Sequence, residues 1–246
     1  MSKIKKKLLS AAIGKATEIQ IKTPLCVVIP ALLEDDDTIL YHPLAGMPLI
    51  IHTLLSFEQI SFVDEIIVIL REKQLKHMAD LCRVHGITKV SKLICAHEPG
   101  MAALSQGIEE CRSDTAFIAI HDPLRPFITE KLMKRLLKVA RTNGASAPAV
   151  PVRDTIKIVE NQKIISTPDR ASLYTMQSPQ VVEINMCKAA LVHGIEKQQL
   201  HFTSALEDMG LPFALVEGLE ENIRVIETHD FSVAELFLAK WEYEEL

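Results

Sequence analysis

The sequence predicts an α/β protein built on a mostly parallel sheet with helices on both faces. Through the first two thirds of the chain, apolar runs of strand length alternate with amphipathic stretches of helix length. The runs contain few polar residues, as expected for strands that helices cover on both sides. A hydrophobic content of 48% in 246 residues is enough for one large domain with a sizeable core.

The expected strands and helices alternate along the chain up to residue 144. Thr129 is a typical N-cap for one of the helices, and Asn143-Gly144 is a typical end for the same helix. Pro48 suits the first turn of the first helix, and Gly86 follows the end of the second. We expect strands at 25–32, 63–70, 92–96 and 115–120, and helices at 48–60, 72–84, 100–111 and 130–142.

The last third of the chain has a different pattern. Residues 147–166 are expected to be extended, with Asn161-Gln162 at the tip of a hairpin, so an arm should stand off the main sheet. A helix at 184–197, a short segment at 204–209, a strand at 213–217 and a helix at 231–241 follow. No repeat or low-complexity linker divides the chain. We therefore expect a single domain over 25–246 with its arm at about 147–170, and an N-terminal extension over 1–24.

Composition and charge exclude several classes of partner. A net charge of −5 offers no basic footprint, so no nucleic acid is expected to bind. The five cysteines are widely spaced and form no CxxC or His/Cys cluster, which favours reduced thiols over a zinc site. No apolar run approaches the ~18 residues that span a bilayer, and the basic N-terminus lacks a convincing cleavage site. A cytoplasmic protein without a membrane partner is expected.

A first candidate site follows the strand at 115–120. Asp122 stands where a carboxylate could hold a divalent cation, and Arg125, three residues further on, could bind an anion. A turn with an aspartate cap and a surface arginine explains the same residues without any function.

Three further segments carry polar residues that suit phosphate or polyol recognition. Two belong to the arm, PVRDTIK at 151–157 and TPDR at 167–170 with the following MQSPQ, and the third contains Arg224. A solvated hairpin and an ordinary surface arginine are the alternative interpretations. His97, in the turn before the helix at 100–111, indicates no ligand set by itself.

An acidic run, Glu34 to Asp37, follows the first strand. Ligands of open α/β folds bind beyond the carboxyl ends of the strands, where a glycine-rich, cationic loop usually holds phosphates. Here that position has four consecutive carboxylates and no glycine before Gly46. The run is either a solvated turn that bars a triphosphate or a group of magnesium ligands.

Taken in order, these segments resemble the 2-C-methyl-D-erythritol 4-phosphate cytidylyltransferase family from about residue 25 to the end of the chain. HDPLRPF looks like that family's HDAARPF, PVRDTIK like its P-V-x-D-T-x-K, and TPDRASLYTMQSPQ like its T-x-D-R-x-x-L-x-x-x-Q-T-P-Q. LVEGLEENIRVIETHDFSVAE is similar to its L-V-x-G-x-x-x-N-I-K-x-T-x-x-D-L-x-x-A-E. The resemblance implies a Rossmann-like fold, a β-arm that embraces the second subunit of a homodimer, and attack of a sugar-alcohol phosphate on the α-phosphorus of CTP.

The resemblance also implies roles for individual residues. Asp122 and Arg224 correspond to catalytic positions, with Asp122 near the metal and Arg224 where the family has a lysine. The substrate-binding positions implied by the motifs are Arg125, Asp154, Thr155 and Arg170, the last reaching across the dimer. An active protein would use Mg²⁺.

The nucleotide-binding motifs of the family are altered in this chain. Its P-A-A-G-x-G-x-R-M is replaced by Pro30-Ala31-Leu32-Leu33 followed by the acidic run, without glycine, arginine or lysine. Its G-G-x-x-R-x-x-S-V aligns on residues 96–104, where glycine, arginine and serine are lost. We therefore expect a homologue that binds a phosphorylated polyol, for which CTP is a doubtful partner and catalysis is lost or strongly attenuated. The alternative is an active cytidylyltransferase, with methylerythritol phosphate or ribitol 5-phosphate as acceptor, whose acidic loop binds a metal.

Overall fold

A computed structural model describes residues 23–34, 37–199, 201–211 and 213–244. The expected N-terminal extension therefore lies outside the described residues, apart from its last two positions. No helix within the described part of the chain is long and apolar enough to cross a membrane.

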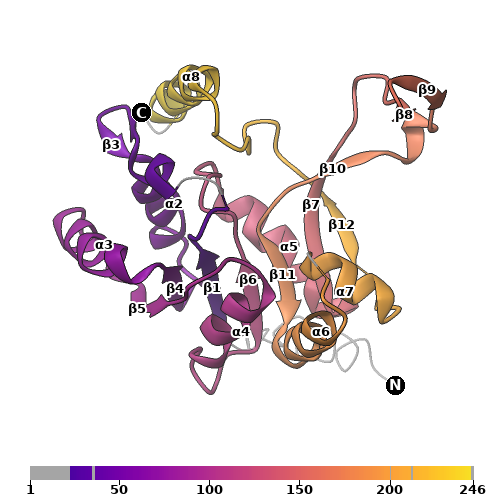
Figure 1. The fold of residues 1–246 in the computed structure, drawn as a ribbon. Helices are drawn as coiled ribbons and strands as arrows, with labels where there is room; N and C mark the ends of the chain where they lie inside the picture. Colours follow the sequence, from indigo (N-terminus) through magenta and orange to yellow (C-terminus); the bar gives the residue numbers. More distant parts are fainter. Residues whose placement is uncertain (1–22, 35–36, 200, 212, 245–246) are drawn as a thin grey trace, which may run out of the picture.

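The core of the fold is an eight-stranded sheet in the order β10-β7-β11-β6-β1-β4-β5, with β12 paired to β7 (Figure 1). Its parallel centre is formed by β1 (Leu25–Pro30), β4 (Glu65–Leu70), β5 (Val90–Cys95) and β6 (Phe117–Ile120). The other strands are β7 (Ala145–Pro151), β10 (Tyr174–Met176), β11 (Gln180–Glu183) and β12 (Ala214–Glu217). Strands β10 and β11 are antiparallel to their neighbours, so the predicted mostly parallel sheet is confirmed.

Alternate residues of β1 face two separate apolar layers. Leu25, Val27 and Ile29 pack in the first layer, which also contains side chains of α2 (Leu49–Glu58), α3 (Glu72–Val84), α5 (Glu130–Asn143) and α8 (Thr228–Glu244). Cys26 and Val28 pack in the second, with side chains of α4 (Met101–Glu109), α6 (Ile184–Glu196) and α7 (Phe202–Asp208). The period of two along a strand thus produces the predicted helices on both faces.

Local signals in the sequence placed most element boundaries within three residues. Thr129 caps α5, because its side-chain oxygen accepts a hydrogen bond from the amide of Leu132 at 3.2 Å. Gly144 follows that helix with a φ of 83°, a value that favours glycine. Pro48 precedes α2 instead of forming its first residue. Short elements that the sequence did not indicate are the 3₁₀ turns η1 (Asp37–Tyr41) and η2 (Arg170–Ser172) and the ribbon of β2 (Pro43–Leu44) with β3 (Met47–Pro48).

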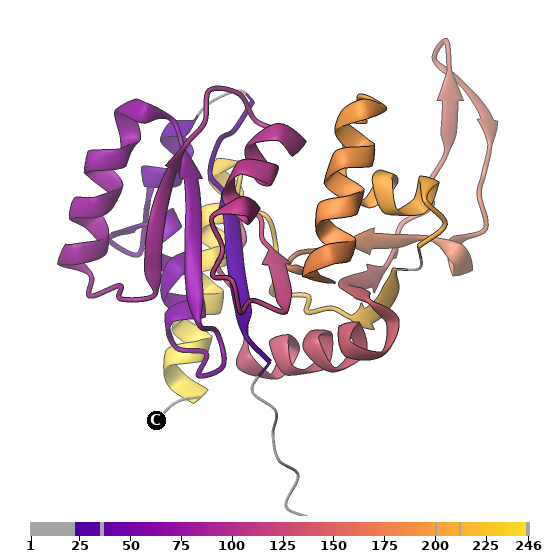
Figure 2. The same cartoon turned by 90° about the horizontal axis from the view of Figure 1, so that it is seen from below.

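The arm is shorter than the sequence predicted. Residues 147–151 belong to β7 inside the main sheet, where Ala147 and Ala149 are buried. The part that stands apart is the hairpin of β8 (Ile158–Glu160) and β9 (Lys163–Ser166) with the segments that lead to it (Figures 1 and 2). Asn161 and Gln162 form the predicted tip, both with positive φ. Because the buried residues of β7 are small alanines, its sequence resembles that of an exposed extended segment, and this is why the sequence predicted it as part of the arm.

Candidate active site

A cavity of about 680 Å³ lies beyond the carboxyl ends of β1 and β6. Pro30 and Leu32 line it from the end of β1, and His121 and Asp122 line it from the end of β6. Glu34 of the acidic run, Ser178 and Arg224 also line it. This is the edge at which open α/β sheets bind ligands, and it gathers residues from four distant parts of the sequence.

The carboxylate of Asp122 is the charged centre of this cavity. Its Oδ1 accepts a hydrogen bond from the amide of Leu124 at 3.0 Å, and its Oδ2 lies 2.9 Å from Nε of Arg224. The same Oδ2 lies 3.6 Å from Nε of Arg125. The structure therefore brings together three of the residues predicted from the sequence, Asp122, Arg125 and Arg224.

The two arginines beside Asp122 differ in what they can bind. The Arg125 side chain is 13% exposed and donates from Nη1 to the carbonyl oxygen of Asn222 at 2.6 Å. Burial lowers its pKa, with the carboxylate of Asp122 acting in the opposite direction. The Arg224 side chain is 46% exposed. Arg125 thus fixes the loop that carries Arg224, and Arg224 is the guanidinium that a ligand in the cavity can reach.

His121 and Ser178 help to position Asp122; both lie in motifs singled out from the sequence, HDPLRPF and MQSPQ, although neither was assigned a role there. The Ser178 hydroxyl oxygen accepts a hydrogen bond from the Asp122 amide at 3.1 Å and lies 3.0 Å from Nδ1 of His121. Nε2 of His121 lies 2.9 Å from the carbonyl oxygen of Arg125. Burial lowers the pKa of His121 to about 4. The ring is therefore neutral, with Nε2–H donating to Arg125 and Nδ1 accepting from Ser178.

A second set of buried amides connects residues 177–178 to the loop before Arg224. Gln177 donates from Nε2 to the carbonyl oxygen of Leu219 at 2.7 Å and accepts from the Leu219 amide at 3.2 Å. Asn222 donates from Nδ2 to the carbonyl oxygen of Ser178 at 2.7 Å. A Cβ on Gly218 would lie 2.3 Å from Oε1 of Gln177, so any larger residue there would displace the Gln177 amide. The only signal for these residues was their place in the motifs of the family that the sequence resembles.

The acidic run differs from the solvated turn that the sequence suggested. Asp37 is buried, and its carboxylate accepts from the Leu33 amide at 2.8 Å and from Nε of Arg71 at 2.7 Å. Arg71 also donates to the carbonyl oxygens of Leu33 at 3.0 Å and His97 at 2.6 Å. The interpretation of Asp37 as a solvated charge is therefore wrong, because a cation 34 residues away neutralises it.

The remaining residues of the run are distributed differently. Glu34 is exposed and lines the Asp122 cavity. Asp37 and Arg71 line a neighbouring cavity of about 660 Å³. Asp35 and Asp36 lie outside the described residues. Glu34 is consequently the described member of the run that faces the candidate active site.

The predicted substrate-binding residues of the arm lie apart from the cavity within one chain. Asp154, Thr155 and Arg170 are exposed, and none of them lines the cavity. Arg170 donates from Nη1 to the carbonyl oxygen of Arg153 at 2.9 Å, and Arg153 forms an ion pair with Glu220. A single chain therefore assembles the Asp122 side of the site and leaves the arm residues open to solvent.

The types of donor at the cavity fit magnesium. Asp122 and Glu34 both offer carboxylate oxygens, the ligands that Mg²⁺ prefers. Two imidazoles, which suit softer metals, also line the cavity: both nitrogens of His121 are already hydrogen-bonded, and His201 is exposed.

Comparison with known proteins gives a consistent result. The sequence profile of the 2-C-methyl-D-erythritol 4-phosphate cytidylyltransferase family matches residues 26–240. The enzyme of that name from Halalkalibacterium halodurans is 31% identical over 201 residues, which is 81% of this chain and 88% of the relative. The one from Caldanaerobacter subterraneus is 32% identical over 204 residues, 81% of this chain and 90% of the relative.

Solved structures share the fold. A 4-diphosphocytidyl-2C-methyl-D-erythritol synthase from Anaerococcus prevotii superposes with a TM-score of 0.79 at 20% identity, covering 89% of this chain and 99% of that one. The cytidylyltransferase from Thermus thermophilus gives a TM-score of 0.69 at 22% identity, covering 87% of this chain and 98% of that one.

Proposed function

The chain belongs to the 2-C-methyl-D-erythritol 4-phosphate cytidylyltransferase family, and from this membership we propose that it binds a phosphorylated polyol in the cytoplasm while its transfer of a cytidylyl group from CTP is lost or strongly attenuated. The reaction of the family is attack of the polyol phosphate on the α-phosphorus of CTP with release of pyrophosphate. The proposal separates the two halves of that reaction, the acceptor side and the nucleotide side.

The observation that carries the proposal is the charge of the Asp122 cavity. Asp122 and Glu34 line it, and both nearby guanidinium groups, those of Arg224 and Arg125, are directed at Asp122. Nucleotidyl transfer depends almost wholly on positioning and on neutralising phosphate charge. One charge pair at ~4 Å is worth about 4 kcal/mol at an effective dielectric constant near 20. A polyanionic triphosphate would therefore meet the carboxylate of Glu34 and two guanidinium groups that already contact Asp122, where the chemistry requires free positive charge.

In the described part of the loop after β1, groups that could bind an external anion already have partners within the chain. The Leu33 amide donates to Asp37 and the Ala31 amide donates to the carbonyl oxygen of Ile69 at 2.8 Å. The guanidinium of Arg71 is bonded to Asp37 and to two carbonyl oxygens. The carboxylate of Asp37 thus takes the backbone amide and the cation that a phosphate would otherwise bind.

On the acceptor side, the retained groups are those of the arm and of Asp122. Asp154, Thr155 and Arg170 carry the hydroxyl and cationic groups that a polyol phosphate requires, and they are exposed. We propose that the arm of a second subunit supplies them to the cavity in a homodimer. The exposed apolar side chains of the arm support this dimer, because a two-stranded ribbon is marginal alone. They are Ile156, Ile158, Val159, Ile164 and Ile165.

One observation favours the alternative of an active cytidylyltransferase. Glu34 and Asp122 line the same cavity and could together hold Mg²⁺, which would neutralise the phosphates of CTP. The pairing of Asp37 with Arg71 also makes the loop less negative than its sequence suggests. In that case the acceptor would be methylerythritol phosphate or ribitol 5-phosphate.

Pyrophosphate release distinguishes the two functions. The wild-type chain is incubated with CTP and methylerythritol phosphate, or ribitol 5-phosphate, over a range of magnesium concentrations. We expect no turnover above the rate without enzyme, together with an increase in melting temperature on addition of methylerythritol phosphate. Robust magnesium-dependent turnover would establish the active alternative. The absence of turnover, together with the absence of any stabilisation by the polyol phosphates, would contradict both functions.

A further inference from the structure

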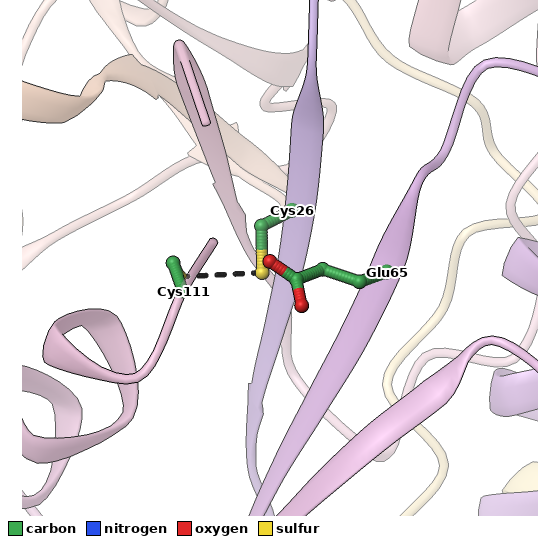
Figure 3. A group of neighbouring side chains, drawn as sticks. All are labelled: Cys26, Glu65 and Cys111. Atoms are coloured by element: carbon green, nitrogen blue, oxygen red, sulfur yellow. Dashed lines mark hydrogen bonds between the residues drawn. The ribbon is translucent and has the colours of Figure 1, made fainter. Parts of the chain in front are cut away.

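A second cluster of ligand-type side chains lies at the opposite end of β1 from the Asp122 cavity. Cys26 near the start of β1, Glu65 at the start of β4 and Cys111 just after α4 converge there (Figure 3). One ligand atom from each lies within 4.8 Å of the other two. The two Sγ atoms are 3.3 Å apart, although 85 residues separate the cysteines in the sequence.

The strand register and the position of α4 explain why these three side chains lie together. Cys26 and Glu65 are direct partners in the parallel pairing of β1 with β4, so their side chains lie on the same face of the sheet. Cys111 follows the helix that covers this face and lies 3.8 Å from the carbonyl oxygen of Gly107. The contact is therefore fixed by regular elements on two sides.

Glu65 is the unusual member of the cluster. It is 4% exposed, and its oxygens accept from the Arg112 amide at 2.8 Å and from the Ser91 hydroxyl at 3.0 Å. No lysine, arginine or histidine among the residues that the structure describes forms an ion pair with it. A buried carboxylate without an ion pair is costly, and such groups are normally paired or coordinate a metal. Its two hydrogen bonds leave lone pairs free and hold it facing the sulfurs, as supporting contacts do for metal ligands.

We propose that Cys26, Cys111 and Glu65 bind one thiophilic divalent cation of the zinc class. Two thiolates and a carboxylate are ligands of the type that zinc takes, and a water molecule would complete four-fold coordination. Binding releases the two thiol protons to solvent, so the bound cluster is two thiolates, one carboxylate and the M²⁺ ion. At a Zn–S distance of about 2.3 Å, tetrahedral geometry places the sulfurs ~3.8 Å apart, so they must separate by about half an ångström.

The role of such an ion is to hold two strands and a helix end together. It would connect β1, β4 and the turn after α4 on the face opposite α2 and α3. Cys111 is partly exposed and gives the ion a route from solvent, whereas Cys26 is fully buried. The site is at the amino ends of the parallel strands, away from the Asp122 cavity at their carboxyl ends.

A disulfide is the competing explanation for two adjacent thiols. Oxidation by hydrogen peroxide would join the sulfurs, and the two electrons and two protons of the thiols would convert the peroxide into two water molecules. A disulfide would leave Glu65 buried without an ion pair, and for this reason we favour the cation.

Cobalt titration of the reduced full-length protein tests the proposal. We expect one Co²⁺ bound per chain with thiolate-to-cobalt absorption in the near ultraviolet, and a zinc-dependent increase in melting temperature. Cys111→Ser should abolish both signals, and Glu65→Gln should weaken cobalt binding at least about tenfold. Cys82→Ser, a buried cysteine outside the cluster, should retain both.

Two results would overturn the proposal. One is the absence of thiolate absorption in the wild type at stoichiometric cobalt. The other is unchanged cobalt binding in both Cys111→Ser and Glu65→Gln, with circular dichroism showing that these variants are folded.

Discussion

Nε of Arg224 lies 2.9 Å from Oδ2 of Asp122, so the most exposed cation of the candidate active site is already paired with a carboxylate of the same site. Any anionic ligand must compete with Asp122 for that guanidinium. A ligand that binds Arg224 in this way leaves Asp122 beside Arg125, whose Nε lies 3.6 Å from Oδ2 of Asp122. The pair therefore couples anion binding to the contacts of Asp122.

Replacement of Arg224 should weaken binding of methylerythritol phosphate. A charge-assisted hydrogen bond is worth about 1.5–3 kcal/mol, so Arg224→Ala should raise the dissociation constant roughly 10- to 100-fold. Arg224→Lys should lose less affinity, because lysine keeps the positive charge; some loss is still expected, because the donor geometry changes. Arg83→Ala, an exposed arginine on α3, serves as the control. Isothermal titration calorimetry measures all three, and equal affinities for Arg224→Ala and the wild type would remove Arg224 from the binding site.

Replacement of Arg170 should weaken binding of methylerythritol phosphate without unfolding the protein. Arg170 is exposed and its guanidinium donates to a backbone carbonyl of the arm, so Arg170→Ala should leave the melting temperature within about 2 °C of the wild type. If a partner subunit brings this guanidinium to the phosphate, affinity should fall about tenfold or more. Calorimetry that shows unchanged affinity would contradict its proposed role.

Neutralising Glu34 should affect CTP binding, whereas neutralising Asp37 should affect stability. Glu34→Gln removes a like charge from the cavity and should strengthen CTP binding without affecting stability. Asp37→Asn leaves Arg71 without its carboxylate in a partly buried position and should lower the free energy of unfolding by roughly 1–3 kcal/mol. The two variants are matched controls in CTP titration and urea unfolding. Loss of a magnesium-dependent turnover in Glu34→Gln would instead support the active alternative.

The neutral state of His121 should make folding stability depend on pH. Its pKa in the fold is about 4, below the ordinary value near 6.5, so the unfolded chain binds a proton first as the pH falls. The contribution of His121 to the free energy of unfolding is fully present above pH ~6.5. It is lost as the pH falls toward 4, and the loss is at most about 3 kcal/mol. Urea unfolding of His121→Gln should lack this component of the pH dependence. His97→Gln, at an exposed position, should retain it.

The exposed arm should hold a homodimer together. Ile164 and Ile165 are 65% and 57% exposed in one chain, and burial against a second subunit removes that apolar surface from water. Sedimentation should show a dimer at micromolar concentration for the wild type. Ile164→Glu combined with Ile165→Glu should shift it to monomer while circular dichroism remains unchanged. A wild-type protein that sediments as a monomer would contradict the dimer.

Local pattern determined the elements of this protein and much of its fold class. The continuous apolar runs of β1, β4 and β6 specified buried parallel strands, and Thr129 with Gly144 specified the two ends of α5. The motifs around Asp122, Arg170 and Arg224 indicated the family, which the comparisons confirm. These features can be predicted from the sequence because capping, turn conformation and periodicity depend on neighbours within a few residues.

Contacts between distant residues were decided only by the tertiary structure. Short strands such as β10 and β11 carry little apolar signal, and their antiparallel pairing with β7 makes β7 part of the sheet instead of the arm. The charge of the acidic run could not be counted from the sequence, because Arg71 reaches Asp37 from the end of β4. Spacing along the chain likewise predicted no metal cluster, yet the register of β1 with β4 places Cys26 beside Glu65 and near Cys111. Charge and ligand sets are properties of positions in space, and the pairing of strands, which is set by the packing of the whole core, determines which residues share a position.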